Sequence, residues 1–343
     1  VVLDEAQYIK NPLTQVARAA KRLPAGVRFA LTGTPIENRL SELWSIFDFL
    51  MPGLLGTRDS FAKRFESPVE HAEGDSAARL QALVSPFVLR RVKEDVVADL
   101  PEKIEDTVMA QLTGEQRKLY LANQDRIAQQ VQHREASEFK KDKLKVLAEL
   151  TKLRQICCDP RLHYEDYKAG SAKLDTCMEL VHGALDGGHR ILLFSQFTGM
   201  LDIIGKRLTK EDIAFLKLTG ASSKESRAKM VAQFQAGEVP VFLISLKAGG
   251  VGLNLTAADV VIHYDPWWNV AAQDQATDRA HRIGQQHTVT VYKLIAKGTI
   301  EERIMQMQES KRDLVNSVLG GDGISSALFT REDVLALLGG DGR

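Results

Sequence analysis

Short apolar runs alternate with longer amphipathic segments through the second half of the chain. The apolar runs have the length of β-strands and occupy residues 190–195, 213–218, 241–245, 260–263 and 289–294. The segments between them have helical spacing, as in 200–208 and 224–234, and Ser222 or Ser223 can cap the latter. A capping box over 299–302 predicts a further helix. Apolar strands separated by helices are typical of a parallel sheet covered on both faces, so we predict one α/β domain over 171–310 and a C-terminal brace over 311–343.

The first 56 residues show a shorter piece of the same pattern. Residues 1–3 and 28–31 have the character of strands, and 34–37 have the Thr-Pro-Ile-Glu pattern of a helix start. A pair of short strands is only marginally stable alone, so we interpret 1–56 as the remnant of a first α/β lobe with further strands upstream. Residues 57–170 are predicted to be helical insertions together with the end of this lobe and a linker. Their later part has leucines at helical spacing (Leu144, Leu147, Leu150 and Leu153).

The composition is typical of a soluble globular protein. The chain has 343 residues, of which 44% are hydrophobic, with 45 basic and 45 acidic side chains. No apolar run is long enough to span a membrane, and no secretory leader opens the chain. The three cysteines form no CxxC pair, which favours small buried thiols in a reducing compartment. The neutral total conceals residues 115–154, where ten basic and six acidic side chains give +4. This segment is either a solvated helical face or a nucleic-acid contact.

Polar groups follow two of the predicted strands in the first lobe. Asp4 and Glu5 come directly after residues 1–3, at the end of the strand where ligands bind in open α/β sheets. Such a pair can hold Mg²⁺ through Asp4 and orient a water through Glu5, although adjacent carboxylates also arise by chance. Thr32, Gly33 and Thr34 follow the next strand, where they either sense a phosphate or cap a helix.

Two stretches of the second domain carry phosphate-binding residue types. A glycine-rich loop with Gly249, Gly250 and Gly252 follows the predicted strand 241–245, and it allows close approach of the backbone to a phosphate or a base. No GxxxxGK[ST] loop occurs in the chain. Arg279 and Arg282 are three residues apart, so we expect them on one helix face. They are either arginine fingers for a phosphoryl group or surface salt-bridge partners.

The ordered set of motifs resembles the Swi/Snf family of superfamily 2 helicase-like ATPases. The motifs that carry the resemblance are DEAQ (4–7), LTGTPIENRLSELWSIFDFL (31–50), ILLFSQF (191–197), ISLKAGGVGLNL (244–255), VIHYDPWWN (261–269) and QATDRAHRIGQ (275–285). Three intermediate stretches also resemble the family: 86–103, 150–162 and 293–304. The resemblance implies two RecA-like lobes with ATP and Mg²⁺ between them and movement along double-stranded DNA without strand separation.

The resemblance also assigns roles to single residues, all of them expectations. Asp4 would bind the metal, Glu5 would polarise the attacking water, and Gln7 stands where the family mostly carries His. Thr32, Gly33 and Thr34 would couple hydrolysis to lobe movement. The other expected residues are nucleotide-side Gly250, Gly252 and Gln275, the arginine fingers Arg279 and Arg282, and DNA-facing Ser195, Gln196, Lys247 and Asn254. We expect Trp267 and Trp268 to pack between strand and helix rather than stack on bases.

These expectations define an ATP-dependent double-stranded DNA translocase whose Walker A lysine lies upstream of this sequence. We expect the 343-residue chain alone to be inactive as an ATPase, because half of the nucleotide pocket is missing. Two alternatives remain open: a bacterial ATPase of the same motor class that associates with RNA polymerase, and a non-hydrolysing nucleic-acid-binding module. The short insertions favour a bacterial or archaeal source, with the protein at the nucleoid in the cytoplasm, or in the nucleus if the source is eukaryotic.

Overall fold

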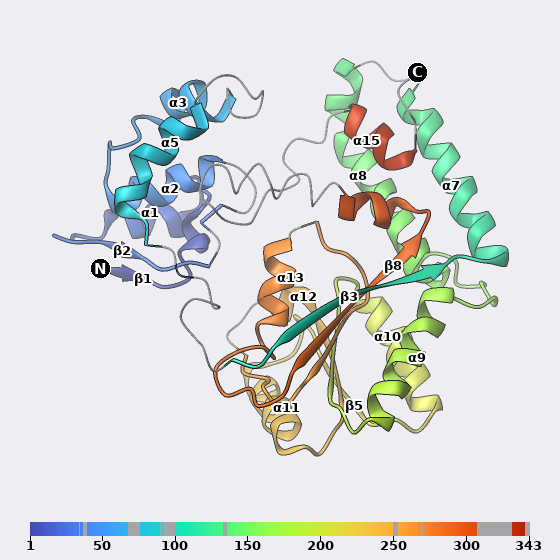
Figure 1. The fold of residues 1–343 in the computed structure, drawn as a ribbon. Coiled ribbons are helices and arrows are strands. Elements are labelled where there is room, and N and C mark those ends of the chain that lie inside the picture. Colours follow the sequence, from blue (N-terminus) through green and yellow to red (C-terminus); the bar gives the residue numbers. More distant parts are fainter. Residues whose placement is uncertain are drawn as a thin grey trace. The chain divides into compact units, whose positions relative to one another are not determined.

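The computed structural model describes residues 1–33, 35–36, 40–67, 76–89, 91, 100–132, 136–249, 253–268, 270–306 and 331–339. Thr34, Gly250, Gly252 and most of the predicted C-terminal brace lie outside these ranges. The chain divides into two compact units (Figure 1). Unit 1 comprises Val1–Arg91, Trp268–Ala271 and Met307–Leu328, and unit 2 comprises Val92–Trp267, Ala272–Gln306 and Phe329–Arg343.

Unit 1 contains a two-stranded parallel sheet and several helices. Strands β1 (Val2–Leu3) and β2 (Phe29–Ala30) pair in parallel and confirm the two strands predicted here. The helical elements are η1 (Ala6–Ile9), α1 (Gln15–Arg22), α2 (Leu40–Leu50), α3 (Arg58–Phe61), the π-helical turn η2 (Ala62–Glu66), α5 (Ser76–Val84) and η3 (Ser85–Phe87). Helix α2 is apolar on most sides because it contributes to two clusters, one with η1 and α1 and one with α3, η2 and α5.

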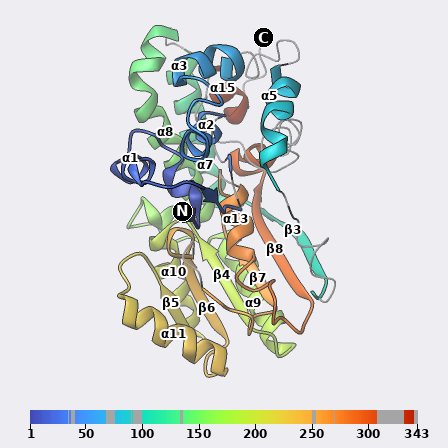
Figure 2. The ribbon, with the colours of Figure 1, turned by 90° about the vertical axis from the view of Figure 1, so that its left-hand side faces the viewer.

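Unit 2 is built on a six-stranded parallel sheet in the order β3-β8-β7-β4-β6-β5. In Figure 2 the strands run from β5 at the left to β3 at the right. Their bounds are β3 Lys103–Gln111, β4 Ile191–Ser195, β5 Phe215–Leu218, β6 Val241–Ser245, β7 Val260–His263 and β8 Val289–Lys297. Every residue of β4, β6 and β7 is buried, as their continuous apolar character predicts. The predicted α/β class of residues 171–310 is therefore confirmed.

Helices cover both faces of this sheet. One face packs against α9 (Ala172–Asp186) and α10 (Thr198–Lys210), and the other packs against α11 (Lys224–Ala236), α12 (Leu246–Gly249) and α13 (Val270–Thr277) (Figure 1). Of the two predicted caps for 224–234, Ser223 is the one that accepts a hydrogen bond from the first turn. The remaining elements are α7 (Gly114–Gln132), α8 (Ala136–Cys158), η4 (Pro160–Leu162), a helix over 300–306 and α15 (Arg331–Leu338).

Strand β3 differs from the expectation for residues 57–170. We predicted helical insertions there, but Lys103–Gln111 forms the edge strand beside β8, and unit 2 begins at Val92 rather than near residue 171. The first half of the strand carries the charged residues Lys103, Glu105 and Asp106, and only Ala110 of the whole strand is buried. An edge strand of this kind lacks the continuous apolar pattern by which the central strands were recognised.

None of the helices that the structure describes is long and apolar enough to cross a membrane.

Candidate functional site

In unit 1, the residues predicted to act on the nucleotide are joined by a chain of side-chain hydrogen bonds. Because β1 and β2 are parallel neighbours, the segments that follow them leave the same edge of the sheet. The Gln7 Nε2 donates to Glu5 Oε2 over 2.6 Å, and the Thr32 hydroxyl donates to Gln7 Oε1 over 2.8 Å. A glutamine amide can donate and accept at once. Gln7 therefore links Glu5 to Thr32 although it stands where His is common.

The backbone of Glu5 is strained. Glu5 has φ 51° and ψ 49°, in the left-handed region that side chains with a Cβ rarely adopt, and its N–H is held by Asp4 Oδ1 over 2.9 Å. Strain of this kind costs about 1–3 kcal/mol and clusters at functional sites. The Asp4 carboxylate is exposed at the end of β1, and a hard carboxylate oxygen in this position fits the ligand preference of Mg²⁺.

In unit 2, Arg279 and Arg282 lie in the segment that follows α13, not on the helix itself. The expectation of a shared helix face is wrong, because α13 ends at Thr277 and tight turns follow. The Arg279 carbonyl accepts from the backbone N–H of Leu255, so it is unavailable for a further helical turn. Arg279 is buried, and Arg282 donates Nη1 to the Leu253 carbonyl over 3.3 Å. Residues 253–255, at the end of the glycine-rich loop, thus contact the backbone of Arg279 and the side chain of Arg282.

A buried histidine holds α13 against the sheet. His263, the last residue of β7, shares a 2.8 Å hydrogen bond between its Nε2 and the Thr277 hydroxyl and stacks on Phe194. Burial, with a contribution from Lys293, lowers the pKa of His263 to about 3, so the ring is neutral. Gln275, expected on the nucleotide side, lies half-buried on the same helix. The contact between His263 and Thr277 therefore helps to place the segment that carries Gln275 and the two arginines.

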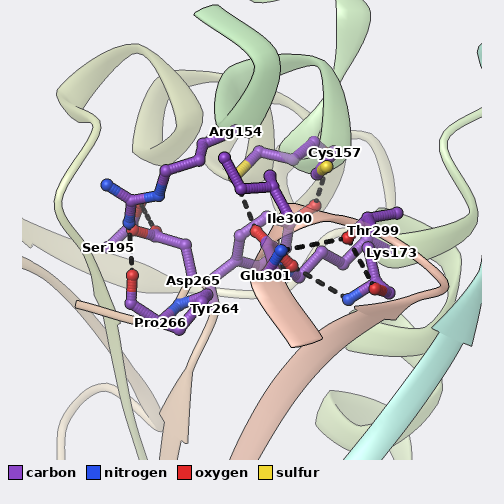
Figure 3. A network of polar contacts seen from close by, with 12 residues as sticks. Arg154, Cys157, Lys173, Ser195, Tyr264, Asp265, Pro266, Thr299, Ile300 and Glu301 are labelled. Carbon is purple, nitrogen blue, oxygen red and sulfur yellow. Dashed lines mark hydrogen bonds and ion pairs between the residues drawn. The ribbon is translucent and has the colours of Figure 1, made fainter. Parts of the chain in front are cut away.

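The residues predicted to face DNA fall into different environments. The Ser195 side chain is fully buried and donates to Asp265, so its hydroxyl has no surface to offer to DNA (Figure 3). Gln196 is half-buried next to it, and Asn254 is exposed. The side chain of Lys247 lies outside the described residues. Trp267 is partly buried against the α13 face of the sheet, which agrees with the expected packing role.

A polar network that the sequence did not reveal supports the end of β4 and the segment after β7 (Figure 3). Its members are Arg154, Ser171, Lys173, Tyr264, Asp265, Thr299 and Glu301. Lys173 and Glu301 form a fully buried ion pair at 2.5 Å. The Cys158 carbonyl accepts from both the Ser171 and the Tyr264 hydroxyl. The sequence signal for Arg154, Thr299 and Glu301 was that 150–162 and 293–304 resemble the family, and Tyr264 and Asp265 lie in the motif over 261–269. No role was attached to any of these residues, and Ser171 and Lys173 had no such signal.

The three cysteines are free and buried, as expected. Burial raises the pKa of Cys157 and Cys158 well above the ordinary thiol value and that of Cys177 to about 12. They are thus poor nucleophiles. Within the described residues, no group of three or more His, Cys, Asp or Glu side chains forms a metal site. A magnesium ion held by one or two carboxylates, its phosphate ligands and water does not require such a group.

The parallel sheet covered by helices and the polar residues at its edge define an ATPase lobe of the helicase type. The model of the SNF2-related domain matches residues 1–162, and that of the helicase conserved C-terminal domain matches residues 172–284. A solved structure titled Sulfolobus solfataricus SWI2/SNF2 ATPase core in complex with dsDNA is 40% identical, with a TM-score of 0.56, over 94% of this chain and 69% of that one. The chain belongs to the SWI2/SNF2 family, and the RecA-like fold expected from the resemblance is confirmed.

Two curated relatives are similar to this chain over almost all of its length. The putative ATP-dependent helicase/translocase YwqA of Bacillus subtilis is 42% identical over 97% of this chain and 37% of its own length. The TATA-binding protein-associated factor MOT1 of Saccharomyces cerevisiae is 34% identical over 99% of this chain and 21% of its own length. The chain spans about a third of the length of curated bacterial relatives that are named as ATP-dependent helicases.

Proposed function

We propose that this chain is part of a DNA-dependent ATPase that moves along double-stranded DNA without separating the strands. The observation that carries the proposal is the hydrogen-bond chain from Glu5 through Gln7 to Thr32. Because the orientation of the Glu5 carboxylate depends on a neighbouring segment, movement of that segment can be coupled to the hydrolysis step. Binding without hydrolysis would not need this arrangement.

The residues of unit 1 divide the chemistry between them. The exposed Asp4 carboxylate supplies an oxygen ligand for Mg²⁺, which when bound with ATP offsets the negative charge of the phosphates. Glu5 accepts a hydrogen bond from Gln7 through one oxygen, and its carboxylate orients the attacking water. Gly33 and Thr34 continue the segment that starts at Thr32, so a shift of this segment would be transmitted to Glu5 through Gln7.

The residues of unit 2 supply positive charge and a nucleotide-facing edge. In this proposal Arg279 and Arg282 stabilise charge on the transferring phosphoryl group, and Gln275, Gly250 and Gly252 contribute contacts with the nucleotide. The hydrogen bond from the Arg282 side chain to the Leu253 carbonyl supports this role for Arg282, because a charge that stabilises a transition state is most effective when it is fixed beforehand. A fixed guanidinium also avoids the entropy that a free surface arginine loses when it binds.

Contacts with DNA would be mainly to the phosphate backbone. Gln196, Lys247 and Asn254 are the proposed contacts, and the similar Sulfolobus core was solved in complex with double-stranded DNA. Helices α7 and α8, which hold most of the segment with +4 net charge, would add a basic surface. Ser195 acts indirectly through Asp265. Binding of this kind tolerates many sequences and weakens steeply with salt.

The object that the motor moves is a DNA-bound protein in this proposal. The relative MOT1, named as a TATA-binding protein-associated factor, supports a protein partner of that kind. Association with RNA polymerase remains a prediction that a pull-down with the purified polymerase tests.

The central test is an ATPase assay with and without duplex DNA. The chain contains no GxxxxGK[ST] loop, so we expect negligible turnover from the 343 residues alone and DNA-stimulated turnover from a longer protein that joins them to such a loop. In the longer protein, Arg282→Ala should lower turnover by about 10³-fold or more with DNA affinity retained. Arg207→Ala is the matched control, because Arg207 pairs with Glu211 on the surface of the same unit. Unchanged turnover in the Arg282 variant would refute the arginine-finger role.

A further inference from the structure

In its last two turns, helix α8 carries a buried arginine that connects two segments at the carboxyl edge of the sheet in unit 2. Arg154 is 2% exposed. Its Nη1 donates to Gln196 Oε1 over 3.2 Å, its Nη2 donates to the Pro266 carbonyl, and its guanidinium lies 5.7 Å from the centre of the Phe197 ring. Figure 3 shows the side chain reaching from α8 toward Pro266 and Ser195.

The two connected segments leave neighbouring strands. Gln196 follows β4 and Pro266 follows β7, and these strands pair side by side in the sheet. Asp265 completes the connection, since it accepts from the Ser195 hydroxyl and from the Gln196 backbone N–H. The backbone of Gln196 is therefore held by Asp265 while its side chain is held by Arg154. Carboxyl edges of parallel sheets are where α/β proteins bind their ligands.

The contact with Arg154 fixes the orientation of the Gln196 side-chain amide. A guanidinium only donates hydrogen bonds, so the amide must turn its oxygen toward Arg154 and its Nε2 away. The Nε2 is covered and finds no acceptor among the residues that the structure describes. A covered donor without an acceptor is unfavourable, and a phosphate oxygen would satisfy it once a local shift had uncovered the Nε2.

The chemistry of this position favours arginine specifically. Arg154 contacts two acceptors and one ring at once, which a planar guanidinium can do and the compact ammonium of lysine cannot. Burial of a permanent charge is costly compared with an apolar residue of the same volume. Such a residue is better explained by the orientation it imposes than by packing.

We propose that Arg154 is a positioning residue for DNA binding: it sets the orientation of Gln196 and thereby joins the DNA-facing edge of the sheet to the basic helix α8. The inference rests on the proposed binding of duplex DNA. Arg154 itself does not contact DNA in this scheme, and its effect on affinity passes through Gln196.

The test is a double-mutant cycle in the 343-residue chain, with the Kd for a fluorescent DNA duplex measured by anisotropy at low salt. Arg154→Met and Gln196→Met should each raise the Kd about tenfold, as expected when a hydrogen bond to a charged group is lost. The double variant should bind no more than about twofold worse than either single variant, because both remove the same contact. Arg154→Lys should fall between wild type and Arg154→Met.

Two controls separate positioning from loss of structure. The variant Lys173→Met with Glu301→Gln removes another buried cation from unit 2 without touching Gln196, and it should bind DNA like wild type. Circular dichroism checks that each variant is folded, and Arg154→Lys replaces Arg154→Met in the cycle if Arg154→Met does not fold. Additive effects in the cycle, or equal loss in the control, would overturn the proposal. Failure of the wild-type chain to bind the duplex would instead overturn the proposed function on which it rests.

Discussion

The ion pair between Lys173 and Glu301 allows the cost of a buried charge to be measured in unit 2. Both side chains are fully buried and their charged atoms are 2.5 Å apart. At an effective dielectric constant of about 20 the attraction is about 7 kcal/mol, but removing the two ions from water costs several kcal/mol each. Lys173→Met leaves Glu301 buried without its cation, so it should lower the free energy of unfolding by about 3–5 kcal/mol.

The double variant Lys173→Met with Glu301→Gln should recover most of this loss. A neutral glutamine oxygen can still accept the Ala296 N–H that now donates to Glu301 over 2.9 Å. Urea unfolding followed by circular dichroism measures all three proteins. If Lys173→Met costs less than about 1 kcal/mol, or if the double variant is no more stable than the single one, the stranded-charge explanation is wrong.

The pH dependence of the same pair has a definite sign. Burial alone would lower the pKa of Lys173, but the Glu301 carboxylate outweighs it and the pKa is raised above its ordinary value near 10.5. Because the pKa of Lys173 is raised in the folded state, the ion pair contributes its full stability at any pH below the ordinary lysine pKa. That stability is lost only as the pH rises through the raised pKa of the folded state. The double variant Lys173→Met with Glu301→Gln has no titrating group at this site, so the stability difference between it and wild type should stay constant between about pH 6 and pH 9.

Two further predictions concern the strained carboxylate and the buried histidine. At Glu5, with φ 51°, Glu5→Gly should be about 1 kcal/mol more stable than Glu5→Ala in thermal unfolding. The same comparison at Asp212, with φ 55°, is the matched control. Equal stability of the Gly and Ala variants would contradict backbone strain at Glu5. At His263, burial lowers the pKa from 6.5 to about 3. As the pH is lowered between these two values, the unfolded state takes up a proton that the folded state does not. The free energy of unfolding should therefore decrease, by up to about 1.4 kcal/mol per pH unit. His263→Gln should reduce that slope in urea titrations at several pH values, and an unchanged slope would show that other groups cause the acid sensitivity.

The central strands of unit 2 could be predicted from the sequence because burial on both faces leaves a continuous apolar run. β4, β6 and β7 show this pattern, and the structure confirms all three. Strand β3 could not be found in the same way, since its position at the edge of the sheet allows charged residues such as Lys103 and Glu105. The pattern reports the environment of a strand, and an edge strand has a different environment.

The turn structure around the arginines was predicted wrongly for a different reason. Three-residue spacing indicates a shared face only while the helix continues, and α13 ends at Thr277. Beyond this end, the Arg279 carbonyl accepts a hydrogen bond from the Leu255 N–H, between residues 24 positions apart. Gly284, with φ 101°, then provides a turn that a residue with a side chain would form only with strain. Local spacing carries no information about the Leu255 contact.

The buried network shows why recognising a family motif does not by itself identify its chemistry. Arg154 and Glu301 lie in stretches that resemble the family, yet their partners are far away in sequence: Arg154 donates to a carbonyl 112 residues on, and Lys173 pairs with a carboxylate 128 residues on. Lys, Arg and Glu are usually assigned to the surface when only the sequence is known. In this fold they are buried. Arg154 holds the segments after β4 and β7, next to the residues proposed to contact DNA, whereas Lys173 and Glu301 join α9 to the helix over 300–306. The buried residues of such a motif can therefore serve to orient the site. A test of this role must change a buried residue and measure the effect on the function of the site residues that it contacts.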